Sequence, residues 1–466
     1  MSKKKVFSIG ETGLHDATVL GAPRFTLLGL QHMFAMFGST ILVPLLTGLS
    51  VSATLLFAGL GTLLFHYLTK RKVPAFLGSS FAFLAGYAAI APHKEAHLLP
   101  YACFGVMIAG LAYLVLAGFF KAFGADKVMR FFPPIVTGPI IISIGLNLSK
   151  TAIESCEQNW WIALVAIIIV ILCNIWGKGM IKIIPILLGV IGSYFCAAVT
   201  GNIDFSQVIT APWIGNPIDT SRTVFAIFTG GSVDHSLLIT SVITIVPIAF
   251  ATMMEHIGDI SAISSTVGVN YIKDPGLHRT LLGDGLATAL ASLFGAPANT
   301  TYGENTGVLS ITKVFDTKVI RLAACFAVLF SFCPKFATII EAMPTATVGG
   351  ISLVLYGMIS AVGVRNIVET QVDFSKSRNV IIAAMILVLS IGVNYSKLGA
   401  VIFTVAGVKI ALSGLATGSL VGIILNAILP GKDYKFENDS PNKTGVDLEI
   451  GQGESLVIKR KGKQNE

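Results

Sequence analysis

Long apolar runs follow one another along most of the chain, and they constrain its fold more than any other feature. Many reach about 20 residues, the length that an α-helix needs to cross the apolar part of a bilayer. Only 12% of the residues are charged, whereas soluble globular proteins have about 25%. Because backbone groups in lipid must pair within the protein, we predict an all-α polytopic membrane protein.

Apolar runs between lysine and arginine clusters give fourteen predicted transmembrane segments. The first seven are 25–46, 54–68, 73–90, 98–120, 135–148, 160–175 and 183–199. A polar connector at 201–223 follows. The second seven are 237–263, 280–294, 298–314, 320–332, 345–362, 380–391 and 410–429.

The positive charges are distributed as this count requires. If the N-terminus is cytoplasmic and the segments alternate, all but six of the 33 lysines and arginines lie inside; the six are Lys94, Lys150, Arg222, Lys335, Lys397 and Lys409. We therefore predict a multi-pass protein of the cytoplasmic (inner) membrane with both termini in the cytoplasm and no cleaved signal peptide. The net charge of +8 reflects this topology, so nucleic acid is not expected as a partner.

The two halves of the chain share short motifs at one spacing. Gln31-His32 lies 224 residues before Glu255-His256, and the Gly-x-Gly at 59–61 lies 224 residues before that at 283–285. Pro74 and Pro297 deviate from this offset by one residue. Since each half holds an odd number of segments, the second copy would be inverted, as in many secondary transporters.

Four acidic residues fall inside the predicted segments, namely Glu255, Asp259, Asp284 and Glu304. An ionisable group at membrane depth is costly and indicates function by default. Glu255 and Asp259 are four residues apart and share one helix face, which would point to a cavity or would lock two helices together. Asp284 lies near the cytoplasmic Arg279, so a helix–helix hydrogen bond or an interfacial charge explains it equally well.

Two of the segments carry polar interruptions that predict extended backbone followed by a half-helix. Pro297 precedes an extended run at 298–302, and helix resumes near Gly303 and Glu304. Pro74 opens the matching run in the first half, with helix starting near Phe81. Short strands would thus break segments three and ten. The half-helices would direct free N–H groups at the middle of the protein.

Such a site offers carboxylates that accept hydrogen bonds, N–H groups that donate them, and the rings of Phe81 and Tyr302 for stacking. A small, flat, neutral ligand with alternating N–H and C=O groups, such as uracil, suits it. Two acids would repel an inorganic anion.

These residues resemble a known family. The stretch 304–313, ENTGVLSITK, fits the signature Q/E/P-N-x-G-x4-T-R/K/G of the nucleobase–ascorbate transporters (nucleobase:cation symporter-2). QHMFAMFGST at 31–40 is similar to the first-helix motif of that family. GSSFAF at 78–83, EHIGD at 255–259 and DPGLHRTLLGDGL at 274–286 resemble the bacterial uracil permeases within it. The resemblance covers about 20–430, and Glu at the first signature position favours uracil over xanthine or urate.

The resemblance implies fourteen segments in a 7+7 inverted repeat, divided into two domains. A core domain would comprise 24–121 and 236–343, and a gate domain 122–235 and 344–430. Cytoplasmic tails would lie at 1–23 and 431–466, the latter disordered. A homodimer through the gate domain is implied as well.

The family pattern also implies how the site works. Glu255 and Glu304 would hydrogen-bond the base, with Phe81, Tyr302 and the Gly303 backbone around it. Ser39 and Tyr356 would lie nearby, Tyr356 from the gate. The transport would be proton symport, with the proton as coupling ion and no cofactor.

The carrier of the proton is left open between Glu255, Asp259 and Glu304. Some uracil permeases have a histidine where this chain has Asp259. A histidine titrates near neutrality unaided, whereas a carboxylate does so only where burial or a like charge favours its neutral form. His32 and His256 suit a proton relay or structural support, and we assign them to support together with Gln31 and Asn305.

Several other functions are disfavoured by what the sequence contains. The six cysteines form no CxxC pair, and we predict neither disulfides nor a metal site. An ATP-binding P-loop motif is not found. An enzyme is not expected, since no metal-ligand cluster or nucleophile–base pair stands out. The alternatives that stay open are a transporter of xanthine, urate or another purine, and an anion transporter of the same general fold.

Overall fold

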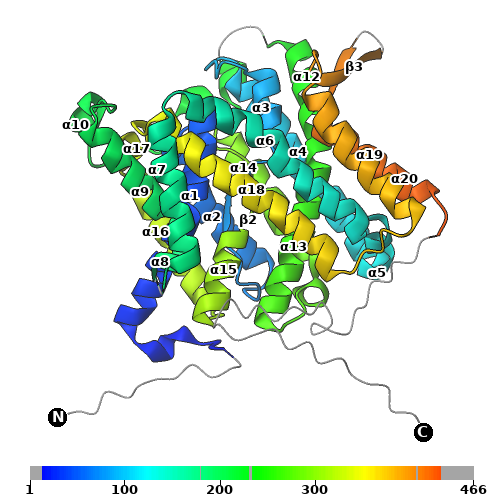
Figure 1. Cartoon of the computed structure of the whole chain (residues 1–466), viewed down its shortest axis with the longest axis horizontal. Coiled ribbons are helices and arrows are strands. Elements are labelled where there is room, and N and C mark those ends of the chain that lie inside the picture. The colour runs from blue at the N-terminus through cyan, green and yellow to red at the C-terminus, as the bar shows by residue number, and fades with distance from the viewer. Residues whose placement is uncertain (1–12, 179, 230–232, 406–407, 432–466) are drawn as a thin grey trace.

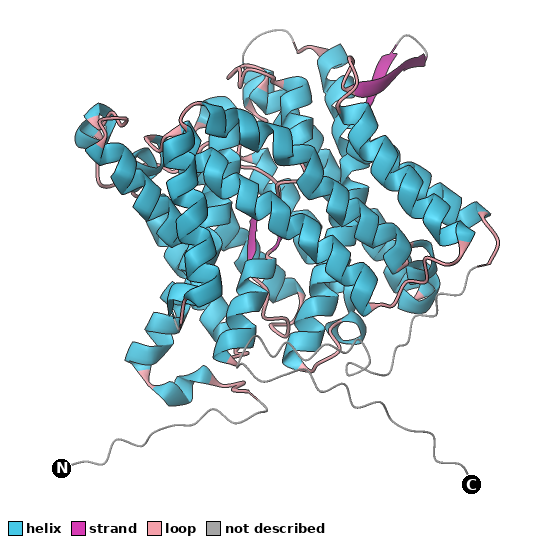
Figure 2. Cartoon of the chain, in the orientation of Figure 1, coloured by secondary structure: helices cyan, strands magenta, loops and turns pink. Residues whose placement is uncertain are grey.

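A computed structural model describes residues 13–178, 180–229, 233–405 and 408–431. The polypeptide is almost entirely helical, with one pair of strands among the helices and another at one end (Figures 1 and 2). Most of the predicted C-terminal tail, 432–466, lies outside the described residues, as do residues 1–12 of the predicted N-terminal tail.

The first half of the chain runs from η1 to α9. Its elements are η1 (Ala17–Leu20), α1 (Ala22–Thr47), α2 (Val51–Leu68), β1 (Leu77–Ser79), α3 (Leu84–Ile90), α4 (Leu99–Phe123), α5 (Ala125–Val128), η2 (Met129–Phe131), α6 (Pro134–Glu157), α7 (Trp160–Trp176), α8 (Met180–Ile183) and α9 (Pro185–Val199). The connector holds α10 (Ser206–Thr210), η3 (Thr220–Arg222) and α11 (Ala226–Thr229).

The second half follows the same order. Its elements are α12 (His235–Ile245), η4 (Val246–Ile248), α13 (Ala249–Val267), η5 (Ile272–Gly276), α14 (Leu277–Leu293), β2 (Asn299–Thr301), α15 (Gly303–Thr312), α16 (Thr317–Ser331), α17 (Pro334–Glu341), α18 (Thr345–Glu369), α19 (Ser377–Asn394), β3 (Ala400–Val405), β4 (Val408–Ser413) and α20 (Gly414–Ile428).

Among the described residues, seven helices are long and apolar enough to cross a membrane, counting α12 to α13 as one. The pair α16 and α17, bent by 87°, adds an eighth span if it is taken as one. Shorter apolar helices cover 160–175, 185–199 and 414–428. The predicted all-α membrane fold is therefore confirmed, while the count of fourteen segments stays a prediction.

The helix contacts between the two halves are reciprocal: a contact made by a helix of the first half with one of the second recurs with the two halves exchanged. Helix α4 packs on α14, and α16 packs on α2; α7 packs on α18, and α19 packs on α6. In the same way, α1 packs on α9 and α13 on α20. The pairs α2 with α14 and α6 with α18 lie where the halves meet. This reciprocity is what an internal repeat related by a two-fold axis produces.

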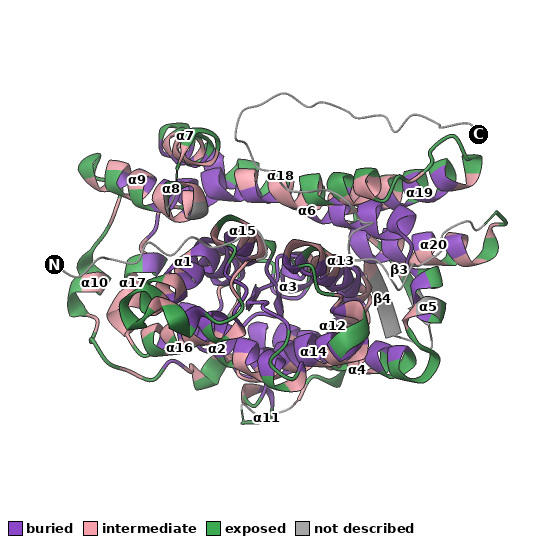
Figure 3. Ribbon diagram, turned by 90° about the horizontal axis from the view of Figure 1, so that it is seen from below, coloured by how far each residue is buried: buried purple, intermediate pink, exposed green. Residues whose placement is uncertain are grey.

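The helices are arranged in two groups, which Figure 3 shows from one end of the molecule. Helices α6, α7, α9, α18 and α19 form a row, and α1 to α4 with α12 to α16 lie beside it. Buried residues concentrate between and within the groups. The division into a core and a gate domain, with its boundaries, stays a prediction.

Two predicted element boundaries are wrong. The last segment was expected at 410–429, but residues 408–413 form β4, which pairs antiparallel with β3 at 400–405, and α20 begins at Gly414. An apolar run of this length fits a strand as well as a helix, so hydrophobicity alone cannot distinguish them. The helix α3 starts at Leu84, three residues after the predicted Phe81, because residues 81–83 form a turn.

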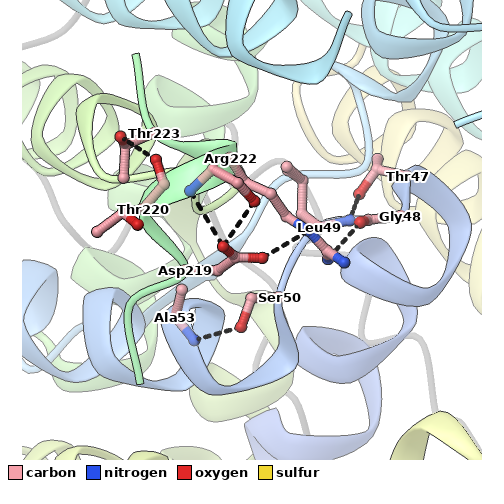
Figure 4. Close-up of polar contacts among 10 residues, drawn as sticks. Thr47, Gly48, Leu49, Ser50, Ala53, Asp219, Thr220, Arg222 and Thr223 are labelled. Carbon is pink, nitrogen blue, oxygen red and sulfur yellow. Dashed lines mark hydrogen bonds and ion pairs between the residues drawn. The ribbon is translucent and has the colours of Figure 1, made fainter. Parts of the chain in front are cut away.

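The connector is hydrogen-bonded to the C-terminal ends of α1 and α14, and Figure 4 shows its contacts with α1. Nη1 of Arg222 donates to the carbonyl of Gly48, the C-cap of α1, at 2.6 Å, while its Nε lies 3.1 Å from a carboxylate oxygen of Asp219. A cation at a helix C-terminus opposes the negative end of the helix dipole. The N–H of Val224 donates to Leu293 O, the last residue of α14.

Candidate functional site

The strands β1 and β2 pair antiparallel in the middle of the molecule, with Leu77 opposite Thr301 and Ser79 opposite Asn299. The N–H of Ser80 donates to Ala298 O and that of Tyr302 to Phe76 O, which extends the ladder at both ends. The predicted breaks in segments three and ten are thus confirmed, and the two broken segments meet across the repeat.

The neighbouring helices satisfy the backbone of these short strands. In α2, the Thr62 hydroxyl accepts from Leu77 N at 2.9 Å. In α14, the Thr288 hydroxyl donates to Asn299 O at 2.7 Å. The amide of Asn299 donates to Phe57 O at 2.8 Å. Extended backbone is tolerated within a membrane protein when it is paired in this way.

Glu304 lies in the first turn of α15, directly after β2. The hydroxyl of Ser39, on α1, donates to its Oε1 at 2.6 Å. A carboxylate at a helix N-terminus is favoured by the dipole and by the free N–H groups there. Glu304 is half-buried, and Gly303 before it is exposed. A Cβ built on Gly303 meets no described atom within 4 Å, so this turn of α15 faces open space.

Glu255 and Asp259 lie on α13, which packs against α15. Both side chains are half-buried, and Glu255 is close enough to Glu304 for the two charges to interact. Asp259 accepts a hydrogen bond from the Thr301 hydroxyl at 2.8 Å. The three acids that sequence reasoning named for substrate and proton therefore gather around the start of α15.

The aromatic residues predicted for the site, Phe81, Tyr302 and Tyr356, make two different kinds of contact. The ring of Phe81 meets that of Tyr356, from α18, edge to face with centroids 5.6 Å apart. Tyr302 is anchored instead: its hydroxyl donates to Ser79 O at 2.8 Å, and the Thr40 hydroxyl donates to it at 3.3 Å. Its ring covers Gly78, where a Cβ would lie 2.5 Å away.

Sequence reasoning missed Thr40 and Ser79, which are both fully buried. Ser79 also donates to Thr40 O at 2.9 Å, so α1, β1 and the residue before α15 are joined by one hydrogen-bond cluster. The only available indication was their position beside Ser39 and Ser80 in the motifs at 31–40 and 78–83.

The residues predicted to give structural support lie behind the site. Nδ2 of Asn305 donates to His32 O at 3.0 Å and lies 3.2 Å from His32 Nδ1, which ties α15 to α1. Gln31 is buried in α1. Nδ1 of His256 lies 3.4 Å from both the Thr301 hydroxyl and Oδ2 of Asp284. Asp284 is thus a fully buried neighbour of the site residues rather than an interfacial charge.

This constellation presents acceptor groups and helix N–H groups at the start of α15, and one aromatic pair between Phe81 and Tyr356 of α18. Within the described part of the chain, no group of three His, Cys, Asp or Glu residues is placed to hold a metal ion. The groups on α1, α13 and α15 can accept and donate hydrogen bonds.

Known proteins match the chain over most of its length. The model of a family described as Permease family matches residues 24–398. The uracil permease of Bacillus caldolyticus is 41% identical over 422 residues, which covers 88% of this chain and 93% of that protein. The uracil permease of Bacillus subtilis (strain 168) is 40% identical over 443 residues, covering 92% and 97%. That of Escherichia coli (strain K12) is 35% identical over 412 residues, covering 86% and 90%.

Solved structures with the same fold are more distant in sequence. The transmembrane domain of a cyanobacterium bicarbonate transporter, BicA, superposes with a TM-score of 0.57 at 14% identity, covering 89% of this chain and 99% of that one. SLC26A9 gives 0.60 at 13% identity, covering 88% and 65%. At such identities the likeness establishes the fold alone.

Proposed function

The chain belongs to the Permease family, which makes it a multi-pass membrane transporter rather than an enzyme, and on that premise we propose that it imports uracil by proton symport. Relatives named uracil permeases, 35–41% identical over most of the chain, support a nucleobase as substrate. The inner membrane as location, the cytoplasmic termini and a homodimer through the gate domain belong to the same proposal.

The observation that carries the proposal is the pair of carboxylates at the open end of α15. Glu304, held by Ser39, directly follows the open position of Gly303, and Glu255 lies on α13, which packs against α15. Uracil has two N–H donors separated by carbonyl acceptors on one flat ring. Two carboxylates can accept from the N–H groups, and the N–H groups of the first turn of α15 can donate to a carbonyl.

Proton coupling would use the same carboxylates. Glu255 and Asp259 share one face of α13, which packs against the half-helix α15 that carries Glu304, and Asp259 is bonded to Thr301 at the end of β2. A proton taken up together with the base would neutralise a charge that must travel with the core. The core would then move against the gate and release both on the other side, as alternating access requires.

Two substitutions test the site. We expect Glu255→Gln and Glu304→Ala each to abolish uptake of labelled uracil in a strain that lacks its own uptake, with normal amounts of protein in the membrane. Asp373→Asn is the control, since this exposed acid contacts only its sequence neighbours, Ser375 by hydrogen bonds and Lys376 by an ion pair. Normal uptake by either site variant would contradict the assignment.

The coupling ion needs a separate measurement. In liposomes containing the purified protein, accumulation of uracil is expected to stop when a protonophore collapses the proton gradient. Accumulation that continues unchanged would exclude proton drive and leave the substrate assignment intact.

A competition assay distinguishes between the candidate substrates. Uptake of labelled uracil is measured at two pH values with an excess of thymine, xanthine, urate, sulfate or bicarbonate. We expect the pyrimidines to compete best. Strong competition by a purine would favour the alternative nucleobase transporter, and competition by the anions alone would favour the anion transporter, which the paired acids disfavour.

A further inference from the structure

A small cavity lies where α3 of the predicted core meets the helices of the predicted gate. Its volume is about 10 Å³, close to what one water molecule needs. It is lined by Ala82 and Ala85 on the core side, and on the gate side by Ile144 and Asn147 of α6, by Asn394 and by Ser413.

The amide of Asn147 is the unusual group in this lining. Its Oδ1 and Nδ2 are both shielded from solvent, and neither forms a hydrogen bond within the described residues. Burying a polar group without a partner costs free energy, and each such group in a native protein calls for an explanation. A leucine of similar size would fill the same place without burying two polar atoms that lack a partner.

The position of the cavity connects it to the substrate site. Ala82 directly follows Phe81, whose ring meets Tyr356. Gly145, two residues before Asn147, packs so tightly on the Tyr356 backbone that a Cβ there would lie 2.1 Å from its carbonyl oxygen. Asn147 lines the cavity together with Ala82 and Ala85, so it lies on the surface that α6 turns towards α3.

We propose that Asn147 is a specificity-determining contact for the base, contributed by the gate. When the core moves relative to the gate, the cavity widens, and the amide meets the edge of the base as it passes Phe81 and Tyr356. One carboxamide offers two donors and an acceptor side by side, and it complements the alternating N–H and C=O groups of a pyrimidine edge. The inference rests on the proposed function and adds a residue that recognises the base outside the acidic site.

The substitution Asn147→Leu separates this role from a structural one. Because leucine removes two unsatisfied buried polar atoms, we expect the melting temperature of the purified protein to rise. At the same time the KM for uracil should increase at least about tenfold, a change of the size of one lost hydrogen bond, and the preference for uracil over xanthine should fall. A structural role for the amide predicts the opposite shift in melting temperature.

Ser143→Ala on the same helix is the matched control, since that hydroxyl only bonds Pro139 O within α6. Its KM and its competition profile should match the wild type. Asn147→Ser, which keeps a donor and an acceptor, should have an intermediate KM, and it serves as the test if the leucine variant does not reach the membrane.

Two results would overturn the inference. One is a KM and a competition profile of Asn147→Leu, or of Asn147→Ser in its place, that equal those of the wild type. The other is a lower melting temperature with an equal loss of uptake for every substrate. Failure of the wild-type protein to take up any nucleobase would instead refute the proposed function.

Discussion

The hydroxyl of Ser39 lies 2.6 Å from Oε1 of Glu304 and fixes one of the two oxygens of that carboxylate. The other oxygen is then free to accept from a substrate. Since Ser39 is fully buried in α1, the same hydrogen bond also sets the distance between α1 and the start of α15. A single hydroxyl therefore orients the acid on which the proposed function depends.

Ser39→Ala should weaken uracil transport without removing it. A hydrogen bond to a charged group contributes about 1.5–3 kcal/mol, so we expect the KM for uracil to rise tenfold or more. Uptake kinetics in cells provide the measurement. Thr47→Val is the control, because this hydroxyl at the end of α1 bonds only nearby backbone groups, the carbonyl of Val43 and the N–H of Leu49. Equal KM values for Ser39→Ala and the wild type would show that Glu304 is positioned by other groups.

Tyr302→Phe tests the anchor beneath the site. The phenyl ring can still cover Gly78, but Ser79 O and the Thr40 hydroxyl lose their partner. Leaving a buried polar group unpaired costs about 1–3 kcal/mol, so the melting temperature of the purified protein should fall and uptake should decrease. The Gly78→Ala variant should show a larger fall in melting temperature and in uptake, since its Cβ would collide with the Tyr302 ring. A Tyr302→Phe protein that matches the wild type in both measurements would show that the ring alone positions α15.

At the scale of elements, the sequence predicted the two broken segments, but it did not predict which residues of other elements contact them. Pro74 and Pro297, each followed by small polar residues, indicated extended backbone, and β1 and β2 lie there. The role of Tyr302 could not be inferred, because its partners Thr40 and Ser79 come from two other elements. The hairpin 400–413 was missed because its apolar residues fit a helix equally well.

The N-terminal segment is a second element that the sequence did not reveal. Leu14 pairs with the residues after α15: its N–H donates to Lys313 O at 2.7 Å, and its carbonyl accepts from Phe315 N at 2.8 Å. Asp316 accepts from Ala17 N at 2.8 Å. Residues 1–23 were predicted only as a cytoplasmic tail, yet part of this segment holds the end of the half-helix that carries Glu304.

Deleting residues 1–16 should therefore loosen α15, and deleting residues 1–12 should not. The longer deletion removes the two backbone hydrogen bonds of Leu14, a loss of roughly 1–3 kcal/mol. We expect a lower melting temperature and a higher KM for uracil, measured on purified protein and in cells. The shorter deletion keeps these contacts and is the control. Identical behaviour of the two deletions would mean that the docked segment is dispensable.

At the scale of the whole molecule, composition and charge distribution predicted the membrane fold, and the motif spacing predicted the repeat that the reciprocal packing displays. The sequence could not predict how core and gate touch, because these contacts depend on the shapes of side chains from distant segments. Two glycines illustrate this. A Cβ on Gly38 of α1 would lie 2.2 Å from Cγ2 of Ile186 on α9, whereas one on Gly258 of α13 would lie 3.7 Å from Ile141 on α6.

If transport requires the core to slide along the gate, Gly38→Ala should slow it. The added methyl group collides with a stiff β-branched side chain, and overpacking of this kind costs about 1–3 kcal/mol. We therefore expect the maximal uptake rate to fall by about fivefold or more. Gly258→Ala, whose methyl group would make an ordinary contact, should be close to the wild type.

The double variant Gly38→Ala/Ile186→Ala decides between a steric block and damage to the neighbouring Ser39. Shortening Ile186 makes room for the new methyl group at the interface between α1 and α9. If the block is steric, the double variant regains most of the uptake rate that Gly38→Ala loses, while Ile186→Ala alone stays close to the wild type. If the rate stays low and the KM is raised, the methyl group has disturbed Ser39 and Glu304, and the contact between α1 and α9 does not limit movement of the core.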